Sequence, residues 1–239
     1  MYDADELAAA LKGVEIIATD VDDTLTINGM LTADVLKSLE YLNRAGKKVI
    51  LVTGRSGGAC TTLAQYLPVT MVIAENGGVV IRSHDIKTID LPGDHKARLH
   101  QCFGTIHTSF PRIEQAQDNP FRLTDLSMDN RSIQQSDFPA IRSIAESFGL
   151  TVVVSSVQTH ILSPLCGKGG TLKSIVHDSK TVTVGDSEND ESMFNPALFP
   201  LSVGVTNIGR YLGMMHYKPR WIMSKEQGYG FIEFVNSVK

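Results

Sequence analysis

The sequence predicts an α/β protein in which a doubly wound parallel sheet is interrupted by a smaller, inserted α+β domain. In residues 1–82 and again in 163–239, short apolar runs alternate with segments of helical periodicity. This alternation favours a parallel sheet covered by helices. Residues 83–162 do not show this regular alternation. We therefore expect a core built from the two outer segments and a separate domain inserted between them.

The first core segment alternates helix and strand along its length. Between Thr32 and Gly46 the apolar residues have helical spacing, and the glycine suits a helix end. Glu75-Asn76-Gly77-Gly78 is a turn signal that predicts a hairpin. The other expected elements are helices at 3–11 and 58–67 and strands at 14–19, 48–52, 71–74 and 79–81.

The inserted segment carries two helical patterns, at 99–110 and 141–148, and strand-like pieces near 121–124 and 151–154. The second core segment again shows the alternation of strands and helices seen in the first. Its expected elements are a helix at 172–176, strands at 181–184, 201–205 and 221–223, and a closing helix at 231–235.

Composition limits the classes of partner. The chain has 239 residues, 42% of them hydrophobic and 20% charged, with a net charge of -4 and no basic cluster. Nucleic acids are bound largely through Lys and Arg, so we expect a small-molecule partner instead. Three widely spaced cysteines suggest no disulfide framework. The acidic start and the lack of a membrane-length apolar run favour a cytoplasmic monomer or homodimer without membrane contact.

Acidic residues crowd the end of the first predicted strand, where Asp20, Asp22 and Asp23 follow an apolar run. Carboxylates this close repel one another unless a cation or a shared proton offsets them. The arrangement therefore indicates Mg²⁺, one protonated acid, or both. A solvated acidic turn is the simpler alternative, and the other strand ends decide between the two.

Two further strands end in polar residues. Thr53-Gly54 follows the strand at 48–52, and the strand at 181–184 ends in Gly185-Asp186-Ser187-Glu188-Asn189-Asp190. Lys168 begins the helix that precedes this last strand. Because the carboxyl ends of parallel strands meet at one edge of a sheet, these residues are expected to form a single phosphate site.

The residue types suit phosphoryl transfer. Asp20 can attack phosphorus as a nucleophile, and Asp22 can protonate the leaving oxygen and later activate water. The Thr53 hydroxyl and the Gly54 amide can donate hydrogen bonds to phosphoryl oxygens, and Lys168 can offset negative charge.

The second acidic strand end supplies the remaining expected groups. Asp186 would hold Mg²⁺ against the phosphate. Asp190 is either a further ligand or a residue that fixes Lys168. Asn189 either orients the phosphate network or caps the following helix.

These segments resemble the four motifs of the haloacid dehalogenase superfamily of phosphohydrolases. Asp20-Val-Asp22-Asp23-Thr24 is similar to the first motif, Thr53-Gly54-Arg55 to the second, Lys168 to the third and Gly185-Asp186 onward to the fourth. The insert is similar to the family's αβ cap of the second type, on a Rossmann-like core.

The resemblance also implies roles. Asp20 would be the nucleophile and a Mg²⁺ ligand, Asp22 the acid/base and a ligand through its carbonyl, and Asp186 a ligand. Thr53 and Lys168 would bind phosphate. Asp23 stands where many relatives with this cap carry Gly.

In the insert, Arg122 and His160 are the candidates for binding an anionic substrate tail, although each residue type is also common in purely structural positions. The Glu75-Asn76-Gly77-Gly78 turn is similar to the subgroup that contains sucrose-phosphate phosphatase and archaeal-type phosphoglycolate phosphatase.

The expected function is a Mg²⁺-dependent phosphatase of a small phosphorylated metabolite, with phosphoglycolate as the first candidate. Sugar-phosphate phosphatases, of the sucrose-phosphate or mannosyl-phosphoglycerate type, and phosphomutases are alternatives within the family. A phospho-accepting receiver module is an alternative of another class, but the insert and the second acidic strand end oppose it. Neither acidic loop has the glycine and glutamate positions of an EF-hand.

Overall fold

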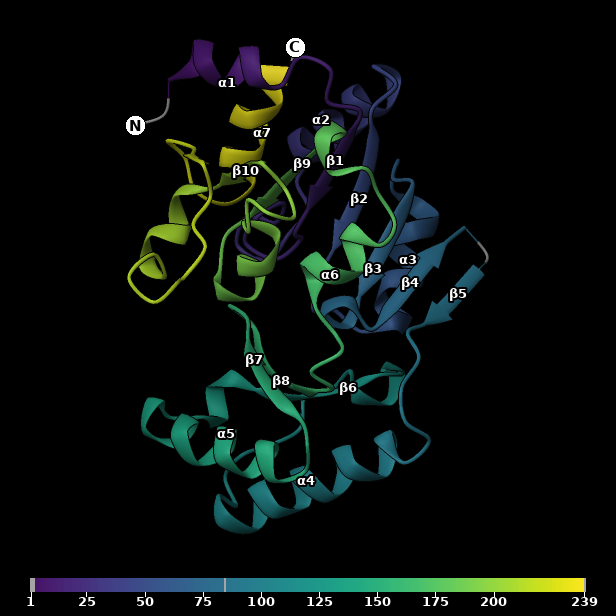
Figure 1. The fold of residues 1–239 in the computed structure, drawn as a ribbon, viewed down its shortest axis with the longest axis vertical. Helices are drawn as coiled ribbons and strands as arrows, with labels where there is room; N and C mark the ends of the chain where they lie inside the picture. The colour runs from purple at the N-terminus through teal and green to yellow at the C-terminus, as the bar shows by residue number, and fades with distance from the viewer. Residues whose placement is uncertain (1–2, 84, 239) are drawn as a thin grey trace.

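The larger of two sheets organises the fold. A computed structural model describes residues 3–83 and 85–238; residues 1, 2, 84 and 239 of the predicted segments lie outside the described residues. Within these ranges the large sheet has eight strands in the order β11-β10-β9-β1-β2-β3-β4-β5 (Figure 1). The strands are β1 (Ile16–Thr19), β2 (Lys48–Val52), β3 (Met71–Ala74), β4 (Val79–Arg82), β5 (Asp85–Thr88), β9 (Thr181–Gly185), β10 (Leu201–Gly204) and β11 (Trp221–Ile222).

The strand β1 lies inside the sheet and pairs in parallel with both β2 and β9. The strands β3, β10 and β11 extend the parallel part, whereas β4 and β5 are antiparallel additions at one edge. The doubly wound parallel sheet expected from the alternating sequence is thus confirmed, as is the hairpin at Glu75–Gly78.

Helices cover both faces of the large sheet. Alternate residues of β1 and β2 point to opposite sides, so that Ile17 and Val49 contact one core cluster while Ala18 and Ile50 contact another. The first cluster includes residues from α1 (Ala4–Ala10), α2 (Ala33–Arg44), α3 (Gly57–Tyr66) and α7 (Gln227–Val238). The second includes residues from α6 (Lys168–Lys173) and the 3-10 segment η6 (Glu188–Met193).

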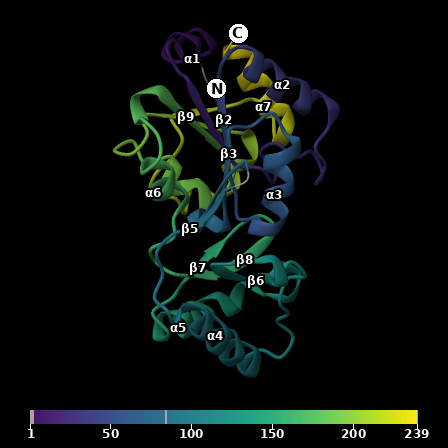
Figure 2. The same cartoon turned by 90° about the vertical axis from the view of Figure 1, so that its right-hand side faces the viewer.

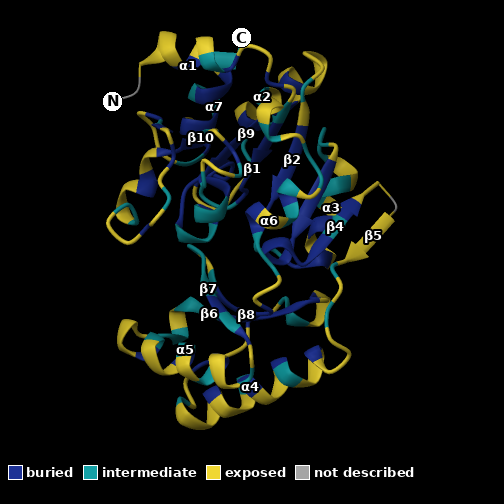
Figure 3. Cartoon of the chain, in the orientation of Figure 1, coloured by how far each residue is buried: buried dark blue, intermediate teal, exposed yellow. Residues whose placement is uncertain are grey.

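The second sheet belongs to the inserted segment and lies below the carboxyl ends of the parallel strands in Figure 1. Its antiparallel order is β6-β8-β7, and two helices pack on it through a separate apolar cluster. Both chain ends lie at the far side of the core (Figure 2), and the outer faces of the two helices are exposed (Figure 3). The elements are α4 (His95–Ser109), β6 (Asp125–Asp129), α5 (Phe138–Ser147), β7 (Thr151–Val154) and β8 (Gln158–Leu162). We call this unit the cap.

The prediction of a strand near residues 121–124 is wrong. The segment η2 (Asn119–Phe121) and a loop occupy that position, and β6 follows at Asp125. The apolar Phe121 packs on Gly58, where an added Cβ would lie 2.7 Å from the Phe121 Cβ. The large sheet also continues past residue 82, since β5 pairs with β4. All four β5 residues are exposed, so the strand lacks the apolar pattern that would predict it.

Candidate active site

The end of β1 carries a buried ion pair. Asp20 follows Thr19 directly, and its Oδ1 accepts a 2.7 Å hydrogen bond from Lys168 Nζ. Lys168 comes from the first turn of α6, and its side chain is 1% exposed. The two residues are 148 positions apart in the chain, and the crossover that brings α6 against the sheet joins them. The expected convergence of Asp20 and Lys168 is therefore observed.

Asp190 holds the same lysine from the opposite side. Its Oδ1 accepts a 2.6 Å bond from Lys168 Nζ, and its Oδ2 accepts bonds from the Asp186 and Ser187 amides. An added Cβ on Gly185 would lie 2.5 Å from this carboxylate, so only glycine fits there. Both Asp190 oxygens are thus engaged in fixing Lys168 and the loop that carries Asp186.

Asp186 lies beside Asp20 because β9 pairs with β1. Its Oδ1 accepts a 3.1 Å bond from the Thr24 hydroxyl, and its Oδ2 accepts a 2.9 Å bond from Asn207 Nδ2. Asn207 lies in η7 (Thr206–Arg210), just beyond the end of β10. Two neutral donors therefore orient the Asp186 carboxylate without neutralising it.

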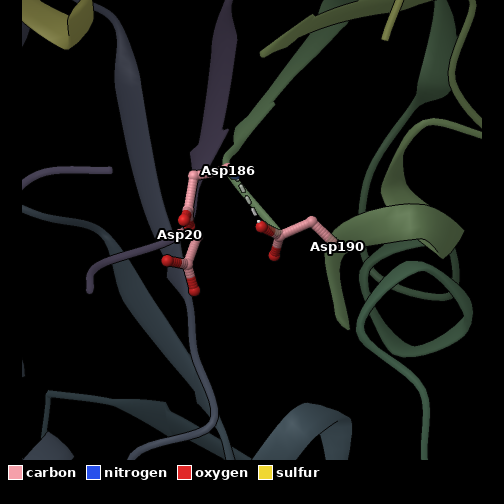
Figure 4. Close-up of side chains that lie close together, drawn as sticks. All are labelled: Asp20, Asp186 and Asp190. Carbon is pink, nitrogen blue, oxygen red and sulfur yellow. Dashed lines mark hydrogen bonds between the residues drawn. The ribbon is translucent and has the colours of Figure 1, made fainter. Parts of the chain in front are cut away.

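The three buried carboxylates of Asp20, Asp186 and Asp190 converge around one small volume (Figure 4). Each offers an oxygen within 4.8 Å of the others. Burial, followed by the charges of Asp190 and Asp22, raises the pKa of Asp20 to about 8 despite Lys168. Burial and the charge of Asp20 also raise the pKa of Asp186. One lysine does not balance this set, and the donors fit a hard divalent cation such as Mg²⁺.

Asp23 occupies a left-handed turn. Its φ is +58°, a region where glycine is favoured and aspartate is tolerated. Its carbonyl accepts from Asn207 Nδ2, and its Oδ1 accepts from Gln227 Nε2. The carboxylate that had no expected role thus ties the Asp20 loop to the first residue of α7.

Asp22 forms a bidentate pair with Arg55. Arg55 Nε donates to Asp22 Oδ2 at 2.8 Å, and the terminal nitrogen donates to Oδ1 at 2.6 Å. Charge-assisted pairs of this shape are strong and directional. The guanidinium is 39% exposed and faces both the Asp20 pocket and an adjoining polar groove. Sequence reasoning gave Arg55 no role, although it directly follows Thr53-Gly54.

The pocket over Asp20 is closed by the cap. Asp20, Asp22, Gly54, Arg55, Ser187 and Asn189 form its core side, and His160 and the loop Ser155–Gln158 form its cap side. Thr53 directly follows β2, is fully buried and precedes Gly54 of the pocket lining. The Asn189 side chain donates a 3.2 Å hydrogen bond to Asn76 Oδ1 and accepts one from the Ser187 hydroxyl. Asn189 therefore belongs to the hydrogen-bond network of the pocket.

The two cap candidates lie differently. His160 lines the pocket and contacts Asp125 through Nδ1 at 2.9 Å. Burial lowers the pKa of His160, and Asp125 offsets this only in part. Arg122 does not line the pocket. Its side chain is 1% exposed and is bound by Asp118 and Asp125, so the structure does not bring this candidate to the Asp20 pocket.

Three contributing residues were missed from the sequence: Arg55, Thr24 and Asn207. Thr24 lies within the first acidic motif, but the sequence does not show that its hydroxyl contacts Asp186. Asn207 follows the strand at 201–205, and treating that strand end like the other three would have identified it.

Comparison with known proteins shows what this chain is similar to. The family model for haloacid dehalogenase-like hydrolases matches residues 17–110. A phosphoglycolate phosphatase of Archaeoglobus fulgidus is 31% identical over 194 residues, covering 78% of this chain and 82% of that protein. A solved structure from Thermoplasma acidophilum has a TM-score of 0.78 at 19% identity, covering 94% and 98% of the two chains. A sugar phosphatase of haloacid dehalogenase subclass IIB has a TM-score of 0.67 at 10% identity, covering 88% and 93%. No helix among the described residues is long and apolar enough to cross a membrane.

Proposed function

This chain belongs to the haloacid dehalogenase-like hydrolase family and is a phosphatase, and from that premise we propose that it hydrolyses phosphoglycolate with Mg²⁺ through an aspartyl phosphate. The observation that carries the mechanism is the buried Asp20–Lys168 pair, whose Asp20 lines a pocket together with Asp22. The named substrate of the Archaeoglobus relative supports the choice of phosphoglycolate.

The reaction divides between two carboxylates. Asp20 attacks phosphorus while the glycolate oxygen leaves and takes a proton from Asp22. Water then attacks the phosphorus of the aspartyl phosphate while Asp22 takes a proton from that water, and the bond between phosphorus and the Asp20 oxygen breaks. Inorganic phosphate leaves, Asp20 is again a free carboxylate and Asp22 is again protonated. Thr53, the Gly54 amide and Lys168 bind the phosphoryl oxygens, and Asn189 orients that network.

The proposed Mg²⁺ ligands are Asp20, the Asp22 carbonyl and Asp186. When bound, Mg²⁺ would neutralise charge on the phosphoryl group. The bonds that Asp190 makes with Lys168 and two amides favour a supporting role over direct ligation, although its carboxylate belongs to the same cluster.

We propose that Arg55, in place of Arg122, binds the carboxylate of the substrate. Arg55 donates to both Asp22 carboxylate oxygens, so neither oxygen is free to protonate a leaving group while this pair is formed. A second anion on the substrate would draw Arg55 away from Asp22. Binding of the tail and release of the acid/base would then be the same event.

Substitution of Arg55 by Lys tests this role. A charge-assisted hydrogen bond contributes about 1.5–3 kcal/mol, so kcat/KM for phosphoglycolate should fall roughly 10- to 100-fold more than kcat/KM for p-nitrophenyl phosphate. The matched control is Arg131→Lys, because Arg131 lines the same outer groove but pairs with Asp129. Equal losses on both substrates would remove Arg55 as the tail-binding residue.

The proposed function itself is tested with a panel of phosphoglycolate, hexose phosphates and p-nitrophenyl phosphate, with Mg²⁺ and with EDTA. We expect phosphoglycolate to have the highest kcat/KM and EDTA to abolish turnover reversibly. A sugar phosphate is the second candidate, because the groove beside Arg55 is lined by Gln117, Asp118, Asn130 and Gln158, whose groups suit hydroxyls. Turnover unaffected by EDTA would contradict the Mg²⁺ assignment.

The remaining expectations complete the proposal. We propose that the cap segment selects the substrate while the outer segments perform the chemistry. The boundaries at residues 82 and 162, the monomeric or homodimeric state and a cytoplasmic location stay predictions from the sequence.

A further inference from the structure

The phosphate loop of the core lies against the cap. Figure 2 shows α3, which directly follows this loop, above the cap strands β6 and β8. Phe121 of the cap packs on Gly58 in the first turn of α3, and His160 of β8 packs over Gly54, where an added Cβ would lie 3.1 Å from Nε2. Cap and phosphate loop are thus in van der Waals contact at two points.

Arg122 uses every one of its donors here. A guanidinium has five N–H groups. Nε and one terminal nitrogen donate to Asp118, and that nitrogen also donates to Gln158 Oε1 at 2.7 Å. The other terminal nitrogen donates to Asp125 at 2.8 Å and, across the domain junction, to the Gly54 carbonyl at 3.0 Å.

The Gly54 carbonyl is part of the peptide that orients Thr53. The same peptide carries the Arg55 N–H, which donates to Thr53 Oγ1 at 3.1 Å. Because the Thr53 oxygen accepts this bond, its own proton is directed elsewhere, and the proposed function directs it to a phosphoryl oxygen. On the other side of Gly54, the Thr53 carbonyl accepts a 3.0 Å bond from the Asn76 amide. Both peptides that flank Gly54 are therefore fixed, one by the core and one by the cap.

Glu75 fixes the cap in return. This fully buried core carboxylate accepts bonds from the Gly57 amide at 2.7 Å, from the Thr124 amide at 2.7 Å and from the Leu123 amide at 3.0 Å. The two residues that follow Arg122 are thereby tied to the core. These bonds hold the Arg122 backbone, just before β6, close to the Gly54 carbonyl.

We propose that Arg122 is a positioning residue for the phosphate site: from the cap, it holds the Gly54–Arg55 peptide so that the Thr53 hydroxyl and the Gly54 amide point at the phosphoryl group. This inference rests on the proposed function of Thr53 and Gly54. It assigns part of the phosphate-binding apparatus to a cap residue that touches no substrate.

The test compares Arg122→Lys with Arg112→Lys. Lysine keeps a charge beside Asp125 but lacks the fork that reaches Gly54. Arg112 is a cap arginine that also pairs with a buried carboxylate, Asp137, and within the described part of the chain its hydrogen bonds go to that cap residue. We expect Arg122→Lys to raise the inhibition constant of inorganic phosphate and the KM of both phosphoglycolate and p-nitrophenyl phosphate by about three- to tenfold, with kcat changing less. Arg112→Lys should leave all three unchanged.

A second readout follows the loop directly. In a ¹H–¹⁵N spectrum, the Gly54 and Arg55 amide signals should shift in Arg122→Lys and stay in place in Arg112→Lys. If Arg122→Lys does not fold, Asp118→Asn loosens the same guanidinium and should shift both amide signals from their wild-type positions.

The outcomes separate the two proposals. A folded Arg122→Lys protein with unchanged phosphate inhibition and unshifted amides overturns the positioning role. A loss confined to phosphoglycolate also overturns it and returns Arg122 to tail binding. Wild-type protein that phosphate does not inhibit would contradict the proposed function, and the amide shifts would then still decide whether Arg122 holds the loop.

Discussion

Lys168 and Arg122 are both buried cations held by two aspartates, yet one lies in the core and the other in the cap. Lys168 has three N–H donors, and Asp20 and Asp190 accept two of them, which leaves one N–H without an acceptor among the described residues. Arg122 gives all five N–H groups to protein acceptors. Burial opposes both charges, but the neighbouring aspartates raise the pKa of each cation. The two cations therefore differ in their number of unengaged donors more than in charge or burial, and the phosphate-binding role proposed for Lys168 needs such a donor.

The largest expected effect is on kcat, and it should differ between Asp20, which pairs with Lys168, and Asp125, which pairs with Arg122. Asp20→Asn should lower kcat on the order of 10⁴-fold or more, because the nucleophile is lost. Its unfolding midpoint at pH 7 without metal should stay near that of the wild type, because the pKa of Asp20, about 8, makes a neutral side chain acceptable there.

Asp125→Asn is the matched cap variant. It should keep kcat within about tenfold but lose about 3–5 kcal/mol of unfolding free energy, because it breaks a buried ion pair. Urea titrations and steady-state kinetics on both variants decide the point. A stable but inactive Asp125→Asn protein would break the comparison.

Exchanging the cations sharpens the contrast. Lys168→Arg should lower kcat about 10²-fold, because the larger planar group displaces the electrostatic contact with Asp20. The reverse exchange, Arg122→Lys, is expected to raise KM and to change kcat less. Single-turnover rates with p-nitrophenyl phosphate would measure this, and a Lys168→Arg enzyme with wild-type kcat would show that only the charge matters.

The smallest expected effect concerns His160, which shares Asp125 with Arg122. Burial lowers the folded-state pKa of His160 below the usual 6.5. The unfolded chain therefore binds a proton first as the pH falls below 6.5, and stability is lost by at most about 1.4 kcal/mol per pH unit. Urea unfolding between pH 7 and pH 5 should show a shallower decline in His160→Asn than in the exposed control His100→Asn. Parallel declines would show that His160 is charged in the folded protein.

The Lys168 side could be predicted from sequence because strand ends are local signals. An apolar run followed by Asp20, Thr53 or Asp186 identifies a strand and its end together, and parallel pairing then places the ends at one edge. The four core motifs therefore located Asp20, Lys168 and Asp186 before their distances were known.

The Arg122 side could not be predicted in this way. The strands β6 and β8 have only short apolar patterns, and Arg122 reaches Gly54 across 68 positions of sequence. The sequence around Arg122 does not show that its four partner residues come from both the core and the cap. Arg55 was missed for the opposite reason, since it lies within a recognised motif but its partner Asp22 is set by the fold.

The placement of β1 between β2 and β9 has a consequence for synthesis on the ribosome. The strand that carries the nucleophile emerges early, but its β9 neighbour ends at Gly185, and Gln227 must follow before Asp23 is tied down. A nascent chain that has exposed Asp20 therefore lacks the groups that neutralise and orient it until most of the polypeptide has been made. Phosphatase activity should accordingly arise late in translation, and the unpaired edge of β1 is the segment most in need of protection before then.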